Sequence, residues 1–221
     1  MAALGLQHPI TLQCPRMEPR NFHTTPLSAG LDLLDATPSA GALTALYGHA
    51  TPAFCVPPTA PLAPGPGNVD VRTLIRGEQT NGQFSNVEVA VGPRQMGPAP
   101  HLHRELDELM YVVEGTATVL IGEEVYEVTA GGWNFRPRGV RHTFWNAADV
   151  PLRFVDCFFH QPFEEYLDEL FHQIIPDMLQ QGLSPAAPAI AGRIAALDER
   201  FGVVWFHEQR PGLVERYGLN P

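Results

Sequence analysis

Cysteines, basic residues and long apolar runs are all scarce in this sequence. The three cysteines, Cys14, Cys55 and Cys157, are odd in number, widely separated and in no Cys-x-x-Cys pair, which argues against a disulfide framework and a structural zinc site. No apolar run approaches the roughly 18–20 residues that cross a bilayer. The N-terminal apolar stretch has no preceding cation and is interrupted by His8 and Pro9, so we expect no secretory signal. These absences predict a soluble, cytoplasmic protein.

Acidic residues clearly outnumber basic ones. The chain has 24 Asp and Glu against 14 Lys and Arg, a formal net charge of −10. Such a charge repels nucleic acid and anionic membrane surfaces, and no basic stripe offsets it. We therefore expect neither as a partner. With 221 residues, 44% of them apolar, the chain is large enough for one packed domain with extensions.

The middle of the chain consists of short segments rich in β-branched and aromatic residues, several of them alternating between apolar and polar positions as half-buried strands do. Asn81-Gly82, between the first two segments, is a strong hairpin signal. About eight short strands without a helical interruption are typical of an antiparallel barrel or jelly roll. The predicted strands are residues 71–76, 86–91, 108–113, 117–121, 125–128, 133–136, 142–145 and 152–159.

The segments on either side follow other patterns. Apolar residues recur at helical spacing from Phe163 to Leu179, and Pro176 should kink or split this helix before Gly182 ends it. A second helix is expected over residues 187–200. The expected fold class is all-β, an antiparallel barrel with an N-terminal arm and C-terminal α-helices. The predicted parts are an arm with a proline-rich connector over 1–67, the barrel over 68–160 and a helical extension over 161–221.

Two histidines and a glutamate within the predicted barrel have the spacing of a metal site. His101 and His103 are two residues apart, and in an extended strand both side chains point to the same side. Glu108 opens a predicted strand whose inward face it shares with Met110 and Val112. Asp107 is the nearest rival carboxylate, but alternation places it on the opposite face. The pattern therefore delivers His101, His103 and Glu108 to one interior.

A third histidine follows a sharp turn. Pro137 fixes its own φ and Gly139 permits a positive φ, so the chain reverses just before His142. Three imidazoles and one carboxylate suit a single divalent transition metal, with positions left for water or substrate. Iron, manganese, nickel, cobalt, copper and zinc all remain compatible with this ligand set.

The two stretches resemble the signature motifs of the cupin family of small β-barrels. The first motif, H-x-H-(x)4-E-(x)6-G, fits His101, His103, Glu108 and Gly115. The second, G-(x)5-P-x-G-(x)2-H-(x)3-N, fits Gly131, Pro137, Gly139, His142 and Asn146. The family's usual glycine six residues before the first histidine is replaced by Gln95. With its barrel and C-terminal helices, the chain is similar to single-domain bacterial cupins related to quercetin dioxygenases.

Apolar residues near the ligands are candidates for a substrate pocket. Met110 and Val112 share the face of Glu108, Phe144 shares the face of His142, and Phe135 is a further candidate. The alternative for each is that it simply fills the barrel. The remaining histidines, His49, His160, His172 and His207, fall outside the pattern and are expected at the surface or its boundary.

The resemblance implies a mononuclear metal enzyme that acts on a small organic substrate, and it favours a quercetinase-like dioxygenase. In such an enzyme Glu108 is the candidate catalytic residue, either as a permanent ligand or as the acceptor of the substrate's hydroxyl proton. The alternatives are a small-molecule-binding module without catalysis and a metal-dependent isomerase or decarboxylase, since one fold hosts many functions. Similar cupins often exchange N-terminal segments, so a homodimer is also expected.

Overall fold

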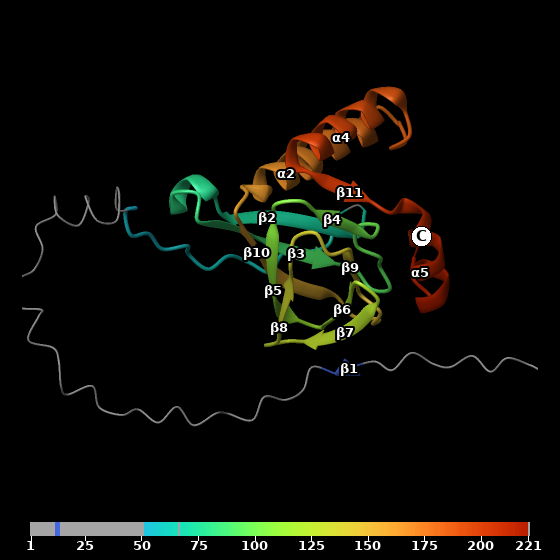
Figure 1. Ribbon diagram of the computed structural model, residues 1–221, viewed down its shortest axis with the longest axis horizontal. Helices are drawn as coiled ribbons and strands as arrows, with labels where there is room; N and C mark the ends of the chain where they lie inside the picture. The colour runs from blue at the N-terminus through green and yellow to red at the C-terminus, as the bar shows by residue number, and fades with distance from the viewer. Residues whose placement is uncertain (1–11, 14–50, 66, 221) are drawn as a thin grey trace, which may run out of the picture. The chain divides into compact units, whose positions relative to one another are not determined.

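Two β-sheets pack against each other in the computed structural model, which describes residues 12–13, 51–65 and 67–220 (Figure 1). Residues 12–13 and 56–220 belong to one of the two compact units of the chain, and this unit contains both sheets and the helices. The expectations for most of the N-terminal arm, including those for Cys14 and His49, fall outside the described residues. The division into arm, barrel and helical extension stays a prediction.

The first sheet has five antiparallel strands in the order β2-β3-β10-β5-β8. Strands β2 and β3 form the predicted hairpin, connected by the 3₁₀ turn η1 (Gly77–Thr80) and by Asn81 and Gly82, whose φ angles of 60° and 74° lie in the left-handed region. The strands are β2 (Val69–Ile75), β3 (Phe84–Val91), β10 (Leu152–Phe159), β5 (Asp107–Glu114) and β8 (Trp133–Arg136).

The second sheet has the order β1-β7-β6-β9-β4-β11. Its pairs are antiparallel except at one edge, where β1 lies parallel to β7. The other edge is β11, which follows the helices in sequence and was not predicted. The strands are β1 (Leu12–Gln13), β7 (Glu124–Thr129), β6 (Thr116–Ile121), β9 (His142–Trp145), β4 (His101–His103) and β11 (Val203–Trp205).

Apolar side chains fill the space between the sheets. Phe144 of β9 meets Phe154 of β10 edge to face, with ring centroids 5.0 Å apart. Met110 and Val112 of β5 are fully buried in the same cluster. Burial of each such side chain contributes about 1.5–3 kcal/mol, and this core holds the two sheets at a fixed separation.

Helices lie over one end of the barrel, where α2 and α4 pack together (Figure 1). A π-helical segment that ends at Ile174, two residues before Pro176, interrupts the first helix. Proline has no N–H to donate within the helix, so the regular hydrogen-bond pattern cannot continue through it. The expected class "all-β" was therefore too narrow. The elements are α2 (Phe163–Glu169), the π-helical η2 (Leu170–Ile174), α3 (Ile175–Gln180), α4 (Pro188–Phe201), η3 (His207–Gln209) and α5 (Arg210–Tyr217). Within the described ranges, no helix is both long and apolar enough to cross a membrane.

The turn residues behave as their sequence predicts. Gly115 has a φ of 80°, and a Cβ there would lie 2.7 Å from the Pro151 carbonyl oxygen, so only glycine fits this turn. Asn146 holds a neighbouring loop, since its Nδ2 donates to the carbonyls of Gly92 and Val150. The eight predicted strands are confirmed, with ends that differ from the prediction by at most two residues.

Candidate metal centre and cavity

Four polar side chains from three strands converge inside the barrel. His101 and His103 come from β4, Glu108 from β5 and His142 from β9. His101 and His142 are direct cross-strand partners, which places their rings side by side with centroids 4.6 Å apart. The ligand atoms of all four residues lie within 4.8 Å of one another, and all four residues are buried. The structure thus brings together the four residues that the sequence proposed as ligands.

Backbone carbonyls set the protonation of two of these rings. His101 Nδ1 lies 2.9 Å from the Ala99 oxygen, and His142 Nδ1 lies 2.9 Å from the Val140 oxygen. A carbonyl only accepts, so each Nδ1 donates its proton and the neutral ring keeps a lone pair on Nε2. Outer hydrogen bonds of this kind are what orient metal-binding histidines. Sequence reasoning did not identify these partners.

Glu108 completes the group with a carboxylate oxygen that faces the Nε2 lone pair of His142. Its Oε2 lies 2.7 Å from His142 Nε2, yet neither atom has a hydrogen bond of acceptable geometry within the described part of the chain. Among the residues that the structure describes, both ring nitrogens of His103 also have no hydrogen-bond partner. His103 Nε2 lies 3.7 Å from Glu108 Oε1. Buried acceptors without a donor are costly. A cation between them removes that cost.

The charges of the group also suit a cation. Burial and the neighbouring histidines hold the pKa of His101 well below its usual value. Burial likewise lowers the pKa of His103 to about 4. Burial alone would raise the pKa of Glu108, but Arg136 and the histidines outweigh it and hold that pKa well below its usual value. Neutral imidazoles and an ionised carboxylate are the protonation states that a divalent transition metal requires.

The turn before His142 is tied to the strand that carries the other two histidines. The Gly139 N–H donates to the His103 carbonyl at 2.7 Å. The Asp107 carboxylate accepts from the Arg138 backbone N–H at 2.9 Å, and the Arg138 side chain lowers the pKa of Asp107 to about 2. Asp107 therefore faces outward as predicted, and it fixes the turn instead of offering a ligand.

A buried ion pair lies behind Glu108. Arg136 of β8 has its Nε 3.6 Å from Glu108 Oε2, and its Nη2 donates to Asp156 Oδ2. Arg136 is 1% exposed and Asp156 4% exposed. Burial raises the pKa of Asp156 to about 6, although the guanidinium acts in the opposite direction. Arg136 thus sits between two carboxylates, only one of which belongs to the metal centre.

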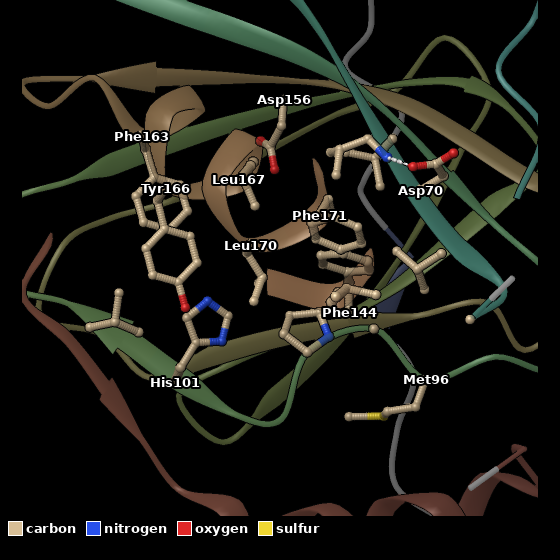
Figure 2. Close-up of a pocket in the computed structure, with 18 of the residues that line it drawn as sticks. Asp70, Met96, His101, Phe144, Asp156, Phe163, Tyr166, Leu167, Leu170 and Phe171 are labelled. Atoms are coloured by element: carbon tan, nitrogen blue, oxygen red, sulfur yellow. Dashed lines mark hydrogen bonds between the residues drawn. The ribbon is translucent and has the colours of Figure 1, made fainter. Parts of the chain in front are cut away.

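The metal group opens into a large apolar cavity of about 540 Å³, a size typical of small-molecule sites. Its walls come from the inner faces of the sheets and from α2, η2 and α3, which contribute Tyr166, Leu167 and Phe171 among others (Figure 2). His101 and Glu108 line it together with Arg136 and Asp156. Its main apolar lining residues are Val71, Val89, Phe144, Phe158, Phe163, Leu167, Leu170, Phe171, Ile175, Leu179 and Trp205.

The four residues predicted for the pocket lie in different places in the structure. Phe144 lines the cavity. Met110 and Val112 are wholly buried in the core and do not reach it, so for them the alternative of filling the barrel holds. The choice of Phe135 was wrong, because β8 turns Asn134 and Arg136 inward and leaves Phe135 51% exposed on the outer face.

The other histidines that the structure describes lie away from the metal group. His160 is exposed and lies 3.4 Å from the Asp107 carboxylate. The ring of His172 bonds the Val71 carbonyl at 3.1 Å, and His207 stacks on Trp205. All three have the surface or boundary positions expected from the sequence.

Most residues that line the cavity were not predicted from the sequence, among them Arg136, Asp156 and Trp205. Arg136 and Asp156 form the buried pair, and Trp205 of β11 packs on His101 with ring centroids 4.9 Å apart. One signal was available for Asp156, because it is the single polar residue in an inward row that also contains Leu152, Phe154 and Phe158. Trp205 gave no such signal, since its position depends on the pairing of β11 with β4.

Residues 87–158 match the family model described as the cupin domain. The span contains all four candidate metal ligands, so the match supports a cupin domain in this part of the chain. The quercetin-dioxygenase-like subgroup stays a prediction. No curated protein sequence matches the chain.

Several solved structures are similar to part of the chain. The polyketide cyclase RemF from Streptomyces resistomycificus is 28% identical, over 45% of this chain and 70% of that one, with a TM-score of 0.39. A sugar phosphate isomerase of the cupin superfamily from Silicibacter pomeroyi is 25% identical, over 42% and 60%, with a TM-score of 0.36. A predicted oxalate decarboxylase from Thermotoga maritima is 18% identical, over 41% and 79%, with a TM-score of 0.39.

Proposed function

We propose that this protein is an enzyme that holds one divalent transition metal ion and uses dioxygen to oxidise a small, largely apolar organic molecule. His101, His103, Glu108 and His142 would hold the ion. The observation that carries the proposal is the position of this group beside an apolar cavity of about 540 Å³ that His101 and Glu108 line. A metal site beside an enclosed apolar space is suited to chemistry from which water is excluded.

The protein side chains have separate tasks in this proposal. A divalent ion held there would supply Lewis-acid polarisation of a substrate oxygen. The Ala99 and Val140 carbonyls keep the lone pairs of His101 and His142 directed at the ion's position. Arg136 keeps Glu108 ionised. Glu108 lines the cavity, so it either stays a ligand or accepts a proton from the substrate's hydroxyl group.

The lining of the cavity bears on the alternatives. A sugar or a small diacid exposes polar groups on all sides, and each of them needs a partner in a buried site. Here Glu108, Arg136 and Asp156 form one connected polar cluster. The residues that α2, η2 and α3 contribute to the walls are mostly apolar, among them Leu167, Leu170 and Phe171 (Figure 2). This distribution favours an apolar, ring-sized substrate over the substrates of a sugar isomerase or a diacid decarboxylase.

An oxygen-uptake screen tests the proposal. The metal-depleted protein is reconstituted in turn with iron, manganese, nickel, cobalt, copper and zinc, and each form is assayed with flavonols, β-diketones and catechols. The control is a His101→Ala, His142→Ala double variant treated in the same way. We expect oxygen consumption equal to substrate loss with at least one metal, and none in the double variant.

The other outcomes separate the alternatives. Substrate turnover without oxygen consumption would replace the dioxygenase by an isomerase or decarboxylase. Metal uptake with ligand binding and no turnover would favour a binding module. A protein that takes up no metal would show that the four residues are a structural cluster.

A further inference from the structure

Asp156 is a buried carboxylate that the metal centre does not use. It lies on β10 at an inward position, two residues from Phe154 and two from Phe158, and it is 4% exposed. It lines the cavity, and its carboxylate points into the space in front of Leu167 (Figure 2). A charged group at such a position is unfavourable unless both of its oxygens have partners.

Only one of the two oxygens has a partner within the part of the chain that the structure describes. Oδ2 accepts from the Arg136 guanidinium, whereas Oδ1 is buried and accepts no hydrogen bond. Buried polar atoms in native proteins are almost always satisfied. The free oxygen therefore points to a donor that comes from a molecule in the cavity.

Three other polar side chains around the cavity already have hydrogen-bond partners. The Tyr166 hydroxyl donates to Asp198 at 2.7 Å, and Gln95 Nε2 donates to the Met96 carbonyl at 3.1 Å. Arg210 Nη1 donates to the Gly97 carbonyl at 2.8 Å. Asp156 Oδ1 thus differs from these neighbours in having its hydrogen-bonding capacity still available.

We propose that Asp156 Oδ1 is a second polar anchor of the cavity, which accepts a hydrogen bond from a hydroxyl group of the substrate that is distinct from the oxygen at the metal. Arg136 links the two anchors, because it contacts both Glu108 and Asp156. The substrate class is then a ring-sized, mostly apolar molecule with a ligating oxygen at one point and a hydroxyl donor at another. This inference rests on the proposed function in that it takes the same cavity as the substrate site.

Paired probes test the anchor. The probes are 3-hydroxyflavones with one further hydroxyl group at each ring position in turn, and each is compared with the methyl ether of that hydroxyl. Dissociation constants are measured by calorimetry under argon, once with zinc-loaded protein and once with metal-free protein. Zinc has no redox chemistry, so the probes are not consumed.

The expected result is a preference for the hydroxyl over the ether at one ring position. A hydrogen bond to a charged carboxylate is worth roughly tenfold in affinity or more. In Asp156→Asn, which keeps the shape of the side chain, the preference should fall to within about twofold. The matched control is Asp149→Asn, an exposed aspartate paired with Arg94, in which the preference should persist.

Two results would overturn the proposal that Asp156 is an anchor. The first is an unchanged preference for the hydroxyl in Asp156→Asn, which would mean that the ether is rejected for its size. The second is no preference for the hydroxyl at any ring position in the parent protein. If Asp156→Asn does not fold, the Arg136→Met, Asp156→Leu double variant is used instead, since it exchanges the buried ion pair for apolar residues. The dissociation constants of the probes are then measured with the metal-free form of this variant. Failure of zinc to bind would instead count against the proposed function, because the metal-free arm reports on the anchor independently.

Discussion

Removal of one histidine should abolish the stabilisation that a metal ion gives to this protein. The perturbation is His142→Ala, which deletes a ligand atom that lies 2.7 Å from Glu108 Oε2. An ion that binds only the folded state, and is present at a free concentration 100 times its dissociation constant, stabilises that state by about 2.7 kcal/mol. For a chain of this size, each kcal/mol raises the Tm by roughly 2–4 °C, so zinc should raise the Tm of the parent by about 5–11 °C.

The variant should lose most of this shift. Loss of an outer hydrogen-bond partner alone weakens metal binding by about 10–100-fold, so loss of a ligand should weaken it by about 100-fold or more. At the same zinc concentration the stabilisation then falls to about 0.4 kcal/mol, a shift of roughly 1–2 °C. The comparison is between scans with and without zinc for each protein, which removes the effect of the substitution on the metal-free state.

The matched control is His172→Ala, since that ring bonds the Val71 carbonyl outside the metal group. It should keep the full zinc-induced shift, as measured by differential scanning calorimetry. An equal shift in the parent and in His142→Ala would refute the assignment of His142 as a ligand. The absence of a shift in the parent with each of the six metals would refute the metal centre itself.

Three further predictions concern pH, packing and assembly. The metal-free protein should lose stability as the pH falls from about 6.5 toward 4, because the pKa of His103 is about 4 in the folded state and near 6.5 when unfolded. Urea unfolding should show a loss of about 2 kcal/mol at pH 5. A His103→Gln variant whose free energy of unfolding falls with pH at the same slope would contradict this prediction. Gly97→Ala should destabilise the fold by about 1–3 kcal/mol, because the added Cβ would lie 2.6 Å from Phe144 Cε2. Gly192→Ala on the exposed face of α4, where nothing lies within 4 Å of the added Cβ, should instead stabilise the fold by up to about 1 kcal/mol. Equal unfolding midpoints for the two variants would show that the space at Gly97 is not limiting. Light scattering should give a mass near twice that of the 24.3 kDa chain if the protein is a homodimer, and a mass of one chain at all concentrations would exclude it.

The barrel and its ligands were accessible to sequence reasoning because the determining features are local. The strand period of two fixes which side chains face inward, and the glycine and proline turns fix where each strand ends. His101 and His103 share a face because they are two residues apart in a strand. Glu108 and His142 join them because the motif spacing matches the strand lengths that the structure shows.

The cavity was not accessible in the same way because it depends on contacts between distant segments. Trp205 reaches His101 only through the pairing of β11 with β4. Leu167 and Phe171 line the cavity because a helix with a π-helical break lies across the open end of the barrel. Phe135 was misassigned because the sequence does not say which parity of β8 faces inward. The register with β5, which pairs Glu108 with Arg136, decides it.

The pairing of β11 with β4 has a consequence for the order in which the protein is made. Strand β4 carries two of the four ligands, and until residues 203–205 are synthesised its outer edge has no partner on that side. An unpaired edge is a template for association with other chains, and synthesis proceeds at only about 5–20 residues per second. For several seconds on the ribosome the nascent chain therefore carries the strand of His101 and His103 as an open edge. Early metal capture by the three histidines and Glu108, which are all translated by residue 142, would hold that strand in place until its neighbour arrives.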